Sequence, residues 1–248
     1  MGQCIAVVSG KGGTGKTSFT AGVGAALALS GLRVLCVDCD IGLRNLDIAL
    51  GLSDAALMDF SDVAQQRCTL ERAVVSHPQL AKLSLLTAPI RQRGQPVTGE
   101  QMASLLRAVR IQYDFCLLDA PAGLGDGFLL ATAAADRCVV VTTADASSLR
   151  DAQHTVMELG RFGPGKLHLV VNRVRKKLLR SMHATIDDAM DKAGLPLLGV
   201  VPEDDTLPLA LNRGSPILLS APASPASSAY RNIATRLRGG KAPLLRIK

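Results

Sequence analysis

The sequence predicts a three-layer α/β protein in which a mostly parallel, twisted β-sheet lies between two layers of helices. Short apolar runs alternate with longer amphipathic stretches along most of the 248 residues, as successive βαβ units require. Hydrophobic residues make up 48% of the chain and charged residues 20%, which allows a large core and argues against global disorder. Aromatic residues are scarce at 3%, so the core must consist mainly of Val, Leu, Ile and Ala, as in buried parallel strands.

The expected strands are short apolar runs, and the expected helices are longer stretches with apolar residues at helical spacing. The strands are Gln3–Val8, Arg33–Asp38, Leu83–Thr87, Phe115–Asp119, Arg137–Thr142, Leu167–Asn172 and Leu197–Val201. The helices are Lys16–Ser30, Gly99–Ile111, Gly127–Ala134, Ser147–Gly160, Met182–Ala193, Thr206–Asn212 and Pro225–Arg238. No linker rich in Pro, Gly or Ser occurs before residue 220. We therefore expect a single domain over residues 1–238, followed by a flexible tail over residues 239–248.

A glycine-rich loop follows the first expected strand. The segment Gly10–Thr17, GKGGTGKT, matches G-x-x-x-x-G-K-[ST] between a strand and an alanine-rich helix, the context that makes this pattern a phosphate-binding loop of a P-loop NTPase. Its glycines let backbone N–H groups converge on phosphate oxygens, and the helix N-terminus attracts anions. Lys16 is expected to reach the β- and γ-phosphates, and the Thr17 hydroxyl to ligate Mg²⁺. The nucleotide-binding residues predicted in this loop are Lys11, Gly12, Gly13, Thr14, Gly15, Lys16, Thr17 and Ser18.

Two of the expected strands end in carboxylates. Asp38 ends one of them and is followed by Asp40, and Asp119 ends another. Ligands of open α/β sheets bind at the carboxyl ends of the strands, so we expect these side chains beside the phosphate loop. Asp119 is expected to hold a Mg²⁺-bound water molecule rather than to act as a base. Carboxylates beside a Mg-nucleotide can ligate the metal through water or orient the attacking water. The predicted metal site consists of Thr17, Asp38 and Asp119.

Lys11 is a second lysine that a plain phosphate loop does not have. The string K-G-G-T-G-K-T resembles the deviant Walker A motif of the ParA/MinD family of ATPases. In that family this lysine reaches across a nucleotide-sandwich dimer to the phosphates of the other subunit, so the resemblance implies an ATP-dependent homodimer. The trans charge would act as an arginine finger does, stabilising the transferring phosphoryl group only once two subunits meet. The alternative is that Lys11 is an ordinary solvated loop lysine.

Two further segments extend this resemblance. The run Asp38–Asp47, DCDIGLRNLD, is similar to the switch I segment of the MinD branch, which implies that Asp40 positions the hydrolytic water. Asp119–Gly123, DAPAG, is similar to the D-x-P-A-G of switch II, with Ala at position 120 where Ser is frequent. By resemblance the catalytic residues are Lys11, Lys16 and Asp40.

The base pocket is assigned by the same resemblance. Asn172 and Arg173 end a strand, and by resemblance they contact and pack beside adenine. The loop Val201–Asp204 matches the second base-contacting segment, through Pro202 and Asp204. Considered alone, an Asn at a strand end is as readily a turn former as a ligand. The implied cofactors are ATP and Mg²⁺.

The segment Ala144–Asp151 resembles the helix start that receives partner proteins, and its Ser147 and Ser148 are expected to be N-cap residues.

The formal charge of +7 indicates an acidic partner, which could be nucleic acid, an anionic membrane surface or nucleotide phosphates.

In the tail, Gly239 and Gly240 are expected to form a flexible hinge before an apolar and basic segment, which alone in water should be disordered. The family resemblance implies a short membrane-binding element there, strengthened by pairing in a dimer. A solvated tail is the alternative. The basic cluster Arg173–Arg180 could bind DNA phosphates, lie on a membrane, or form a solvated loop.

Two observations bear on location and chemistry. The sequence shows no secretory segment and no apolar run near the roughly 20 residues of a transmembrane helix, so we expect a cytoplasmic protein, peripheral on the inner face of the cell membrane by resemblance. Cys36 and Cys39 have CxxC spacing, but no second ligand pair accompanies them, and alternation along a strand sends them to opposite faces. We expect the cysteines to be structural.

Taken together, the sequence is identified as a member of the MinD branch of the ParA/MinD ATPases. This implies an ATPase that positions the bacterial division septum and is reset by hydrolysis to ADP and phosphate. The implied partners are a division inhibitor of the MinC type, an activator of the MinE type or another kind, and an anionic membrane. The alternatives are a ParA-like DNA-partition ATPase, with nucleic acid the less favoured partner, and a flagellar-placement ATPase. A metal-cluster carrier is disfavoured because the late paired cysteines of that branch are not in this sequence.

Overall fold

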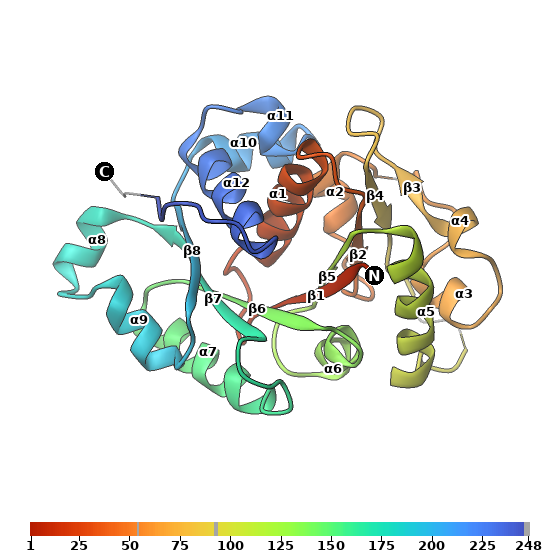
Figure 1. The fold of residues 1–248 in the computed structure, drawn as a ribbon, viewed down its shortest axis with the longest axis horizontal. Helices are drawn as coiled ribbons and strands as arrows, with labels where there is room; N and C mark the ends of the chain where they lie inside the picture. Colours follow the sequence, from red (N-terminus) through yellow and green to blue (C-terminus); the bar gives the residue numbers. More distant parts are fainter. Residues whose placement is uncertain (54, 92–93, 246–248) are drawn as a thin grey trace.

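One twisted sheet forms the centre of the computed structural model, which describes residues 1–53, 55–91 and 94–245 (Figure 1). Within these residues the sheet has eight strands in the order β3-β4-β2-β5-β1-β6-β7-β8. Every neighbouring pair is parallel except β3 and β4. The strands are β1 Gln3–Val8, β2 Val34–Asp38, β3 Val75–Ser76, β4 Leu83–Leu86, β5 Phe115–Asp119, β6 Arg137–Thr142, β7 Leu167–Val174 and β8 Leu197–Pro202. The predicted α/β class is confirmed.

Helices cover both faces of this sheet (Figure 1). One face carries α1, α2, α10, α11 and α12, and the other carries α3 to α7 and α9, as the two hydrophobic clusters show. The helices are α1 Lys16–Leu29, α2 Leu46–Leu50, α3 Phe60–Ala64, α4 Leu70–Ala73, α5 Gly99–Gln112, α6 Asp126–Thr132, α7 Ala146–Glu158, α8 Lys176–Ser181, α9 Ile186–Ala193, α10 Thr206–Asn212, α11 Ile217–Ser220 and α12 Pro225–Leu237. Across the described ranges, none of these helices has both the length and the apolar character needed to cross a bilayer.

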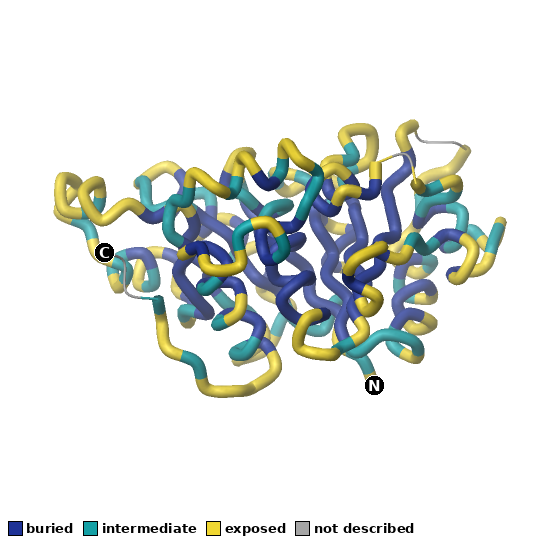
Figure 2. The backbone as a smooth tube through the Cα atoms, turned by 90° about the horizontal axis from the view of Figure 1, so that it is seen from above, coloured by how far each residue is buried: buried dark blue, intermediate teal, exposed yellow. Residues whose placement is uncertain are grey.

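The core consists of two apolar layers separated by the sheet. Alternate residues of β1 enter different layers: Ile5 and Val7 join the α1 side, while Ala6 and Val8 join the α5 side. The central strands are accordingly buried and the outer surfaces of the helices exposed (Figure 2). Cys36 and Cys39 also fall into opposite layers, as alternation predicted, and both are free thiols buried among apolar side chains.

All seven predicted strands and seven predicted helices are present, but several short elements were not predicted. These are β3, α2, α3, α4, α8 and α11, each of six residues or fewer. Such segments are too short for a hydrophobic period to be recognised in the sequence. The basic cluster after β7, for which a solvated loop was the default expectation, forms helix α8. The expectation that Ser147 and Ser148 cap α7 is wrong, because Asp145 is the N-cap and accepts a hydrogen bond from the Ser148 backbone N–H.

Residues 239–245, which follow α12, fold back onto the domain. Gly239 has a φ of +82°, and the backbone N–H groups of Gly239 and Gly240 donate to the carbonyls of Arg236 and Thr235 at 2.9 Å. This is a Schellman motif, which reverses the chain at the end of a helix. Residues 239–245 therefore lie against the domain, whereas the sequence alone predicts a hinge and a disordered segment. The expected contributions of residues 246–248 to that segment lie outside the described residues.

Helix α1 packs against α12 through a glycine. A Cβ at Gly22 would lie 2.4 Å from two ring carbons of the fully buried Tyr230. The Tyr230 ring also meets Phe19 edge to face, with 6.2 Å between centroids. The close approach of these two helices therefore depends on the missing side chain at position 22.

Gly22→Ala is expected to destabilise the fold, although alanine favours a helix over glycine by about 1 kcal/mol. The overpacking against Tyr230 costs about 1–3 kcal/mol and outweighs that gain. Urea denaturation should show a lower midpoint for this variant. Gly163→Ala is the control, since a Cβ there meets no atom within 4 Å. A Gly22→Ala chain as stable as the parent would contradict the packing argument.

Candidate nucleotide-binding site

The loop between β1 and α1 is shaped to receive an anion. Gly13 and Gly15 have φ values of +78° and +88°, the left-handed region that favours glycine. A Cβ at Gly15 would lie 2.3 Å from the amide nitrogen of Asn172, so no side chain fits there. Helix α1 begins without a capping side chain and without an acidic residue in its first turn. Its first N–H groups and its positive end are therefore available to a phosphate.

Lys16 lies almost buried at the base of this loop. Its Nζ donates to the Ser9 hydroxyl at 2.8 Å, and that hydroxyl donates to the Lys11 carbonyl at 2.7 Å. Burial lowers the pKa of Lys16, an effect that the nearby carboxylates of Asp119 and Asp40 oppose. Ser9 was not predicted from the sequence; the available signal was a polar residue directly after a buried strand. It holds the lysine in place when no phosphate does.

Asp119 meets the start of α1 beneath the loop. Thr17 Oγ1 donates to one oxygen of Asp119 at 2.7 Å, and Thr20 Oγ1 donates to the other at 3.1 Å. Asp119 is buried, and burial raises its pKa to about 7, although the bond from Thr17 and the charge of Lys16 act in the opposite direction. The predicted pair Thr17 and Asp119 is therefore in direct contact. Thr20, which completes the set, was not predicted.

Asp38 stands beside Asp119, because β2 and β5 are paired with these two residues in register. One of its oxygens accepts from the Asp40 backbone N–H at 2.8 Å and the other from the Leu46 backbone N–H at 3.1 Å. Burial raises the pKa of Asp38 to about 6, against these two bonds. Asp38 thus ties both ends of the switch I segment to the end of β2, a role that the sequence did not predict.

The residues predicted for the metal fit Mg²⁺. Thr17, Asp38 and Asp119 offer only oxygen atoms, which Mg²⁺ prefers. No group of three or more His, Cys, Asp and Glu side chains positioned to hold a metal ion occurs among the described residues. Mg²⁺ commonly binds through one or two carboxylates together with water and substrate phosphates rather than in an all-protein cage. The donor set therefore suits a metal that enters with a nucleotide.

The switch I segment between β2 and α2 is held by several local bonds. Arg44 has a φ of +43° and pairs with Asp47 at 3.0 Å, and the Gly42 N–H donates to the Pro89 carbonyl at 3.1 Å. Asp40 is half-buried at the mouth of the site. Burial raises the pKa of Asp40, and the charge of Lys16 counteracts this. Asp40 therefore lies close enough to Lys16 for the two charges to interact.

Lys11 points away from the phosphate loop of its own chain. Its Nζ donates to Ser147 Oγ at 3.1 Å, and Ser147 donates to Asp145 at 2.7 Å, at the start of α7. Burial opposes the ionisation of Asp145, but hydrogen bonds from Thr143, Ser148 and Ser147 hold its pKa well below the usual range. The structure thus separates the two lysines: Lys16 lies inside the loop, and Lys11 lies exposed on its outer side.

A β-bulge places the two predicted base-contacting residues at the end of β7. The register with β8 shifts between Val171 and Val174, and Arg173 has a φ of +55°. Asn172 is buried and donates from Nδ2 to the Thr14 carbonyl at 2.7 Å, while its Oδ1 has no partner. A buried acceptor without a partner is costly and indicates a missing donor.

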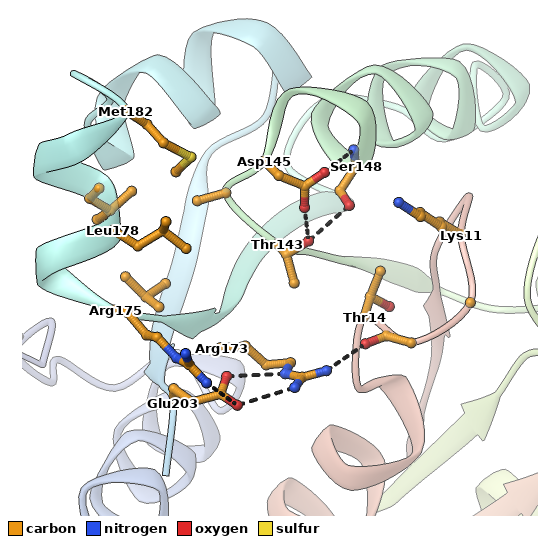
Figure 3. A pocket seen from close by; sticks show the side chains of 15 residues that line it. Lys11, Thr14, Thr143, Asp145, Ser148, Arg173, Arg175, Leu178, Met182 and Glu203 are labelled. Carbon is orange, nitrogen blue, oxygen red and sulfur yellow. Dashed lines mark hydrogen bonds and ion pairs between the residues drawn. The ribbon is translucent and has the colours of Figure 1, made fainter.

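Arg173 faces the other way and forms a fork with Glu203. Its Nε and Nη2 donate to the two carboxylate oxygens at 3.0 and 3.1 Å, and its Nη1 donates to the Gly13 carbonyl at 3.3 Å (Figure 3). Arg175 approaches the same carboxylate at 3.5 Å. Glu203, between the predicted Pro202 and Asp204, was not singled out from the sequence. It connects the loop after β8 to the phosphate loop.

Pro202 ends β8, and Asp204 stabilises two helices. The Asp204 carboxylate accepts from the Thr206 backbone N–H at 3.0 Å and from the Ala226 backbone N–H at 3.0 Å. It therefore joins the starts of α10 and α12. In this structure Asp204 holds the predicted base loop in shape, and whether it also contacts a base stays a prediction.

A cavity of about 310 Å³ lies on the outer side of the phosphate loop (Figure 3). The loop and the start of α7 form one wall, and α8 forms the other with Leu178, Leu179 and Met182. Leu178 and Met182 are exposed. This face of the molecule therefore combines Lys11 with an apolar wall.

The uncapped α1, the buried lysine and the Thr17–Asp119 pair define a P-loop nucleotide-binding protein. A model of the CobQ/CobB/MinD/ParA nucleotide-binding domain matches residues 5–217. The septum site-determining protein MinD of Synechocystis sp. is 37% identical over 246 residues, which cover 99% of this chain and 92% of that protein. This chain belongs to the CobQ/CobB/MinD/ParA family, and within it to the MinD branch.

Solved structures agree with this assignment. A chain of the MinC:MinD cell division protein complex of Aquifex aeolicus matches with a TM-score of 0.90 at 35% identity, over 99% of both chains. The septum site-determining protein MinD of Pyrococcus horikoshii, complexed with Mg-ADP, matches with a TM-score of 0.82 at 29% identity, over 96% of both chains. The predicted fold, family and class of enzyme, a P-loop ATPase, are confirmed.

Asp119→Asn is expected to stabilise the metal-free and nucleotide-free chain above about pH 7. Because the pKa of Asp119 is raised to about 7, the folded chain holds a proton that the unfolded chain releases near its ordinary pKa. The free energy of unfolding therefore falls as pH rises between those two values. Asparagine removes this dependence, which should stabilise the variant by on the order of 1–4 kcal/mol near pH 8.

Urea denaturation in EDTA at about pH 5 and about pH 8 measures the effect, which should shrink at the lower pH. Asp191→Asn serves as the matched control, since Asp191 is an exposed carboxylate of α9. The difference in free energy of unfolding between Asp119→Asn and the parent should grow from about pH 5 to about pH 8. A difference that stays the same at both pH values would contradict the raised pKa of the buried Asp119.

Proposed function

We propose that this chain is a MinD-type ATPase that takes part in placing the bacterial division septum. It binds ATP with Mg²⁺, pairs with a second copy, and returns to the monomer after hydrolysis to ADP and phosphate. The observation that carries this proposal is the contact between Thr17 and Asp119, next to the buried Lys16 and beneath an uncapped helix end. These are the components of Mg-nucleotide recognition.

Each of the predicted site residues is assigned a role in this reaction. Lys16 exchanges its bond to Ser9 for phosphate oxygens and neutralises their charge. Thr17, Asp38 and Asp119 would hold Mg²⁺, directly or through water, and the bound ion would supply positive charge to the phosphates. Asp40, half-buried and coupled to Lys16, is the carboxylate that we assign to orienting the attacking water. Gly12 to Ser18 supply the backbone around the phosphates.

Lys11 is assigned to the active site of the second copy. Two observations support this: its Nζ lies outside its own loop, and its bond to the Ser147 hydroxyl is exposed. A charge delivered from a neighbouring subunit stabilises the transition state only in the dimer. Hydrolysis is thereby tied to pairing.

Adenine recognition is assigned to the bulge at the end of β7. The buried Oδ1 of Asn172 can accept a hydrogen bond from an exocyclic amine, which guanine does not offer at the corresponding position. Arg173 lies in the same bulge, Pro202 ends β8, and Asp204 follows on the loop after β8. ATP is therefore the nucleotide that we propose.

The cellular role and the partners follow from the relatives. Two of the relatives compared above carry the name septum site-determining protein MinD, and the third is a chain of a MinC:MinD complex. We assign to this chain a division inhibitor of the MinC type, an activator of the MinE type or another kind, and the inner surface of the cell membrane. The DNA-partition and flagellar-placement alternatives are not favoured by these relatives.

Lys11→Ala is expected to bind ATP within about tenfold of the parent affinity, while losing ATP-dependent dimerisation and activated hydrolysis. Lys16→Ala should lose ATP binding itself, because it removes the buried cation of the loop. A titration with a fluorescent ATP analogue separates the two variants, while light scattering and phosphate release measure dimerisation and hydrolysis. Lys166→Ala, which changes an exposed lysine elsewhere, is the control. Unchanged activated turnover in Lys11→Ala would rule out the trans-lysine mechanism.

Lipid and DNA binding, measured side by side, test the location. With ATP the full chain should co-sediment with anionic liposomes more strongly than with ADP, and a chain ending at Gly240 should lose most of that difference. ATP-dependent, salt-sensitive retention on non-specific duplex DNA, with no lipid dependence, would instead favour the partition alternative and give the basic helix α8 a role in it. Equal liposome binding by both chains would exclude the tail as the anchor.

A further inference from the structure

A second cavity lies at the opposite end of the sheet from the phosphate loop. Gln3, Phe115 and Arg137 each begin a strand, β1, β5 and β6, so they lie at the amino ends of these parallel strands. Together with Leu237 and Arg238 at the end of α12 they line a cavity of about 390 Å³. The nucleotide site lies at the carboxyl ends of the same strands. The cavity is therefore separate from that site.

Arg137 is half-buried in this cavity, and no carboxylate pairs with it in the part of the chain that the structure describes. Its Nη1 donates to the Leu237 carbonyl at 2.9 Å and to Gln3 Oε1 at 3.5 Å, both neutral acceptors. Burial lowers the pKa of Arg137. In Arg110 burial acts in the same direction, but the hydrogen bond with Asp136 outweighs it and the pKa is raised. Arg137 thus carries a partly desolvated charge without the counterion that buried charges normally have.

Two carboxylates lie next to the lining residues in the sequence, and both already have a partner. Asp114 pairs with Arg33 at 3.0 Å. Asp136 pairs with Arg110 at 3.0 Å and also accepts the Cys4 backbone N–H at 2.7 Å. Neither carboxylate is therefore available to neutralise the cavity.

The arginines of the cavity have hydrogen-bond donors to spare. At the end of α12, one carbonyl accepts from the Gly239 N–H, another from the Gly240 N–H and a third from Nη1 of Arg137, so the helix end needs no further donor. A guanidinium carries five N–H donors, and Nε and Nη2 of Arg137 donate to no group within residues 1–53, 55–91 and 94–245. Arg238 is exposed at the mouth and adds a second positive charge.

We propose that this cavity binds a phosphate group, with Arg137 at its base and Arg238 at its mouth. Two guanidinium groups match a phosphate dianion in charge, and their planar forks suit its oxygen atoms. The bound phosphate would be the counterion that Arg137 lacks among the described residues. A lipid headgroup and a soluble phosphate offer this same chemistry.

Inorganic phosphate, titrated into the full chain saturated with Mg-ADP, tests the site in solution. Because ADP fills the phosphate loop, further binding takes place elsewhere. The backbone amide resonance of Gly239, which lines the cavity, should shift in NMR spectra and give the dissociation constant. Arg137→Gln should weaken phosphate binding about tenfold and Arg238→Gln by a smaller factor. Arg107→Gln is the matched control, since it removes the same charge from an exposed position of α5.

The affinity for Mg-ADP and the urea midpoint show whether each variant is folded. Arg137→Gln also loses the bond to the Leu237 carbonyl. Should that variant unfold, Arg238→Gln tests the site alone, because the Arg238 side chain holds no other part of the described structure. Neither variant should change the affinity for Mg-ADP, since the cavity lies at the other end of the strands.

Vesicles of phosphatidic acid and phosphatidylcholine, with Mg-ADP, form the lipid arm. A headgroup site predicts that Arg137→Gln and Arg238→Gln co-sediment less than Arg107→Gln. Weaker binding of free phosphate in the two cavity variants, with equal co-sedimentation of all three, would support a soluble ligand instead. Phosphate affinities and co-sedimentation that are both equal in the cavity variants and the control would overturn the site.

Discussion

The confinement of a lysine and two carboxylates to the buried meeting point of β1, β2 and β5 governs the rest of this structure. Lys16, Asp38 and Asp119 are removed from water, and each is partly compensated by the others and by hydroxyl or backbone bonds. Charges in such a place are tolerated because each has hydrogen-bond partners, and they favour a ligand that brings the missing charges with it. The site is therefore prepared for a metal–phosphate pair before one arrives.

Much of this arrangement could be predicted from the sequence, because parallel strands deliver the residues that follow them to one edge of the sheet. That rule places Lys16, Thr17, Asp38 and Asp119 together, and the glycine spacing predicts that the loop binds phosphate. Ser9 and Glu203 were not predicted, and for Ser9 the sequence offered only a polar residue directly after a buried strand. Their importance lies in contacts across the chain, to Lys16 and to Arg173, and no local pattern records such contacts.

The tail illustrates a second limit of sequence reasoning. Its composition describes what an isolated peptide would do, and on that basis a disordered segment was expected. The structure supplies partners that composition does not reveal, in Arg236 and Asn232 of a helix that precedes the tail in the chain. Short elements such as α8 escaped prediction for a different reason: six residues are too few to show a hydrophobic period.

Arg236 of α12 donates to the carbonyls of Leu197 and Leu198 in the edge strand β8, and these bonds have a consequence for the solubility of the protein. An open strand edge offers unpaired backbone groups to any extended segment, and chains can add to it in a growing sheet. The opposite edge is blunted by β3, which is two residues long and antiparallel. At β8 the guanidinium of Arg236 occupies the carbonyls of Leu197 and Leu198. Both edges are thus guarded against aggregation by strand addition.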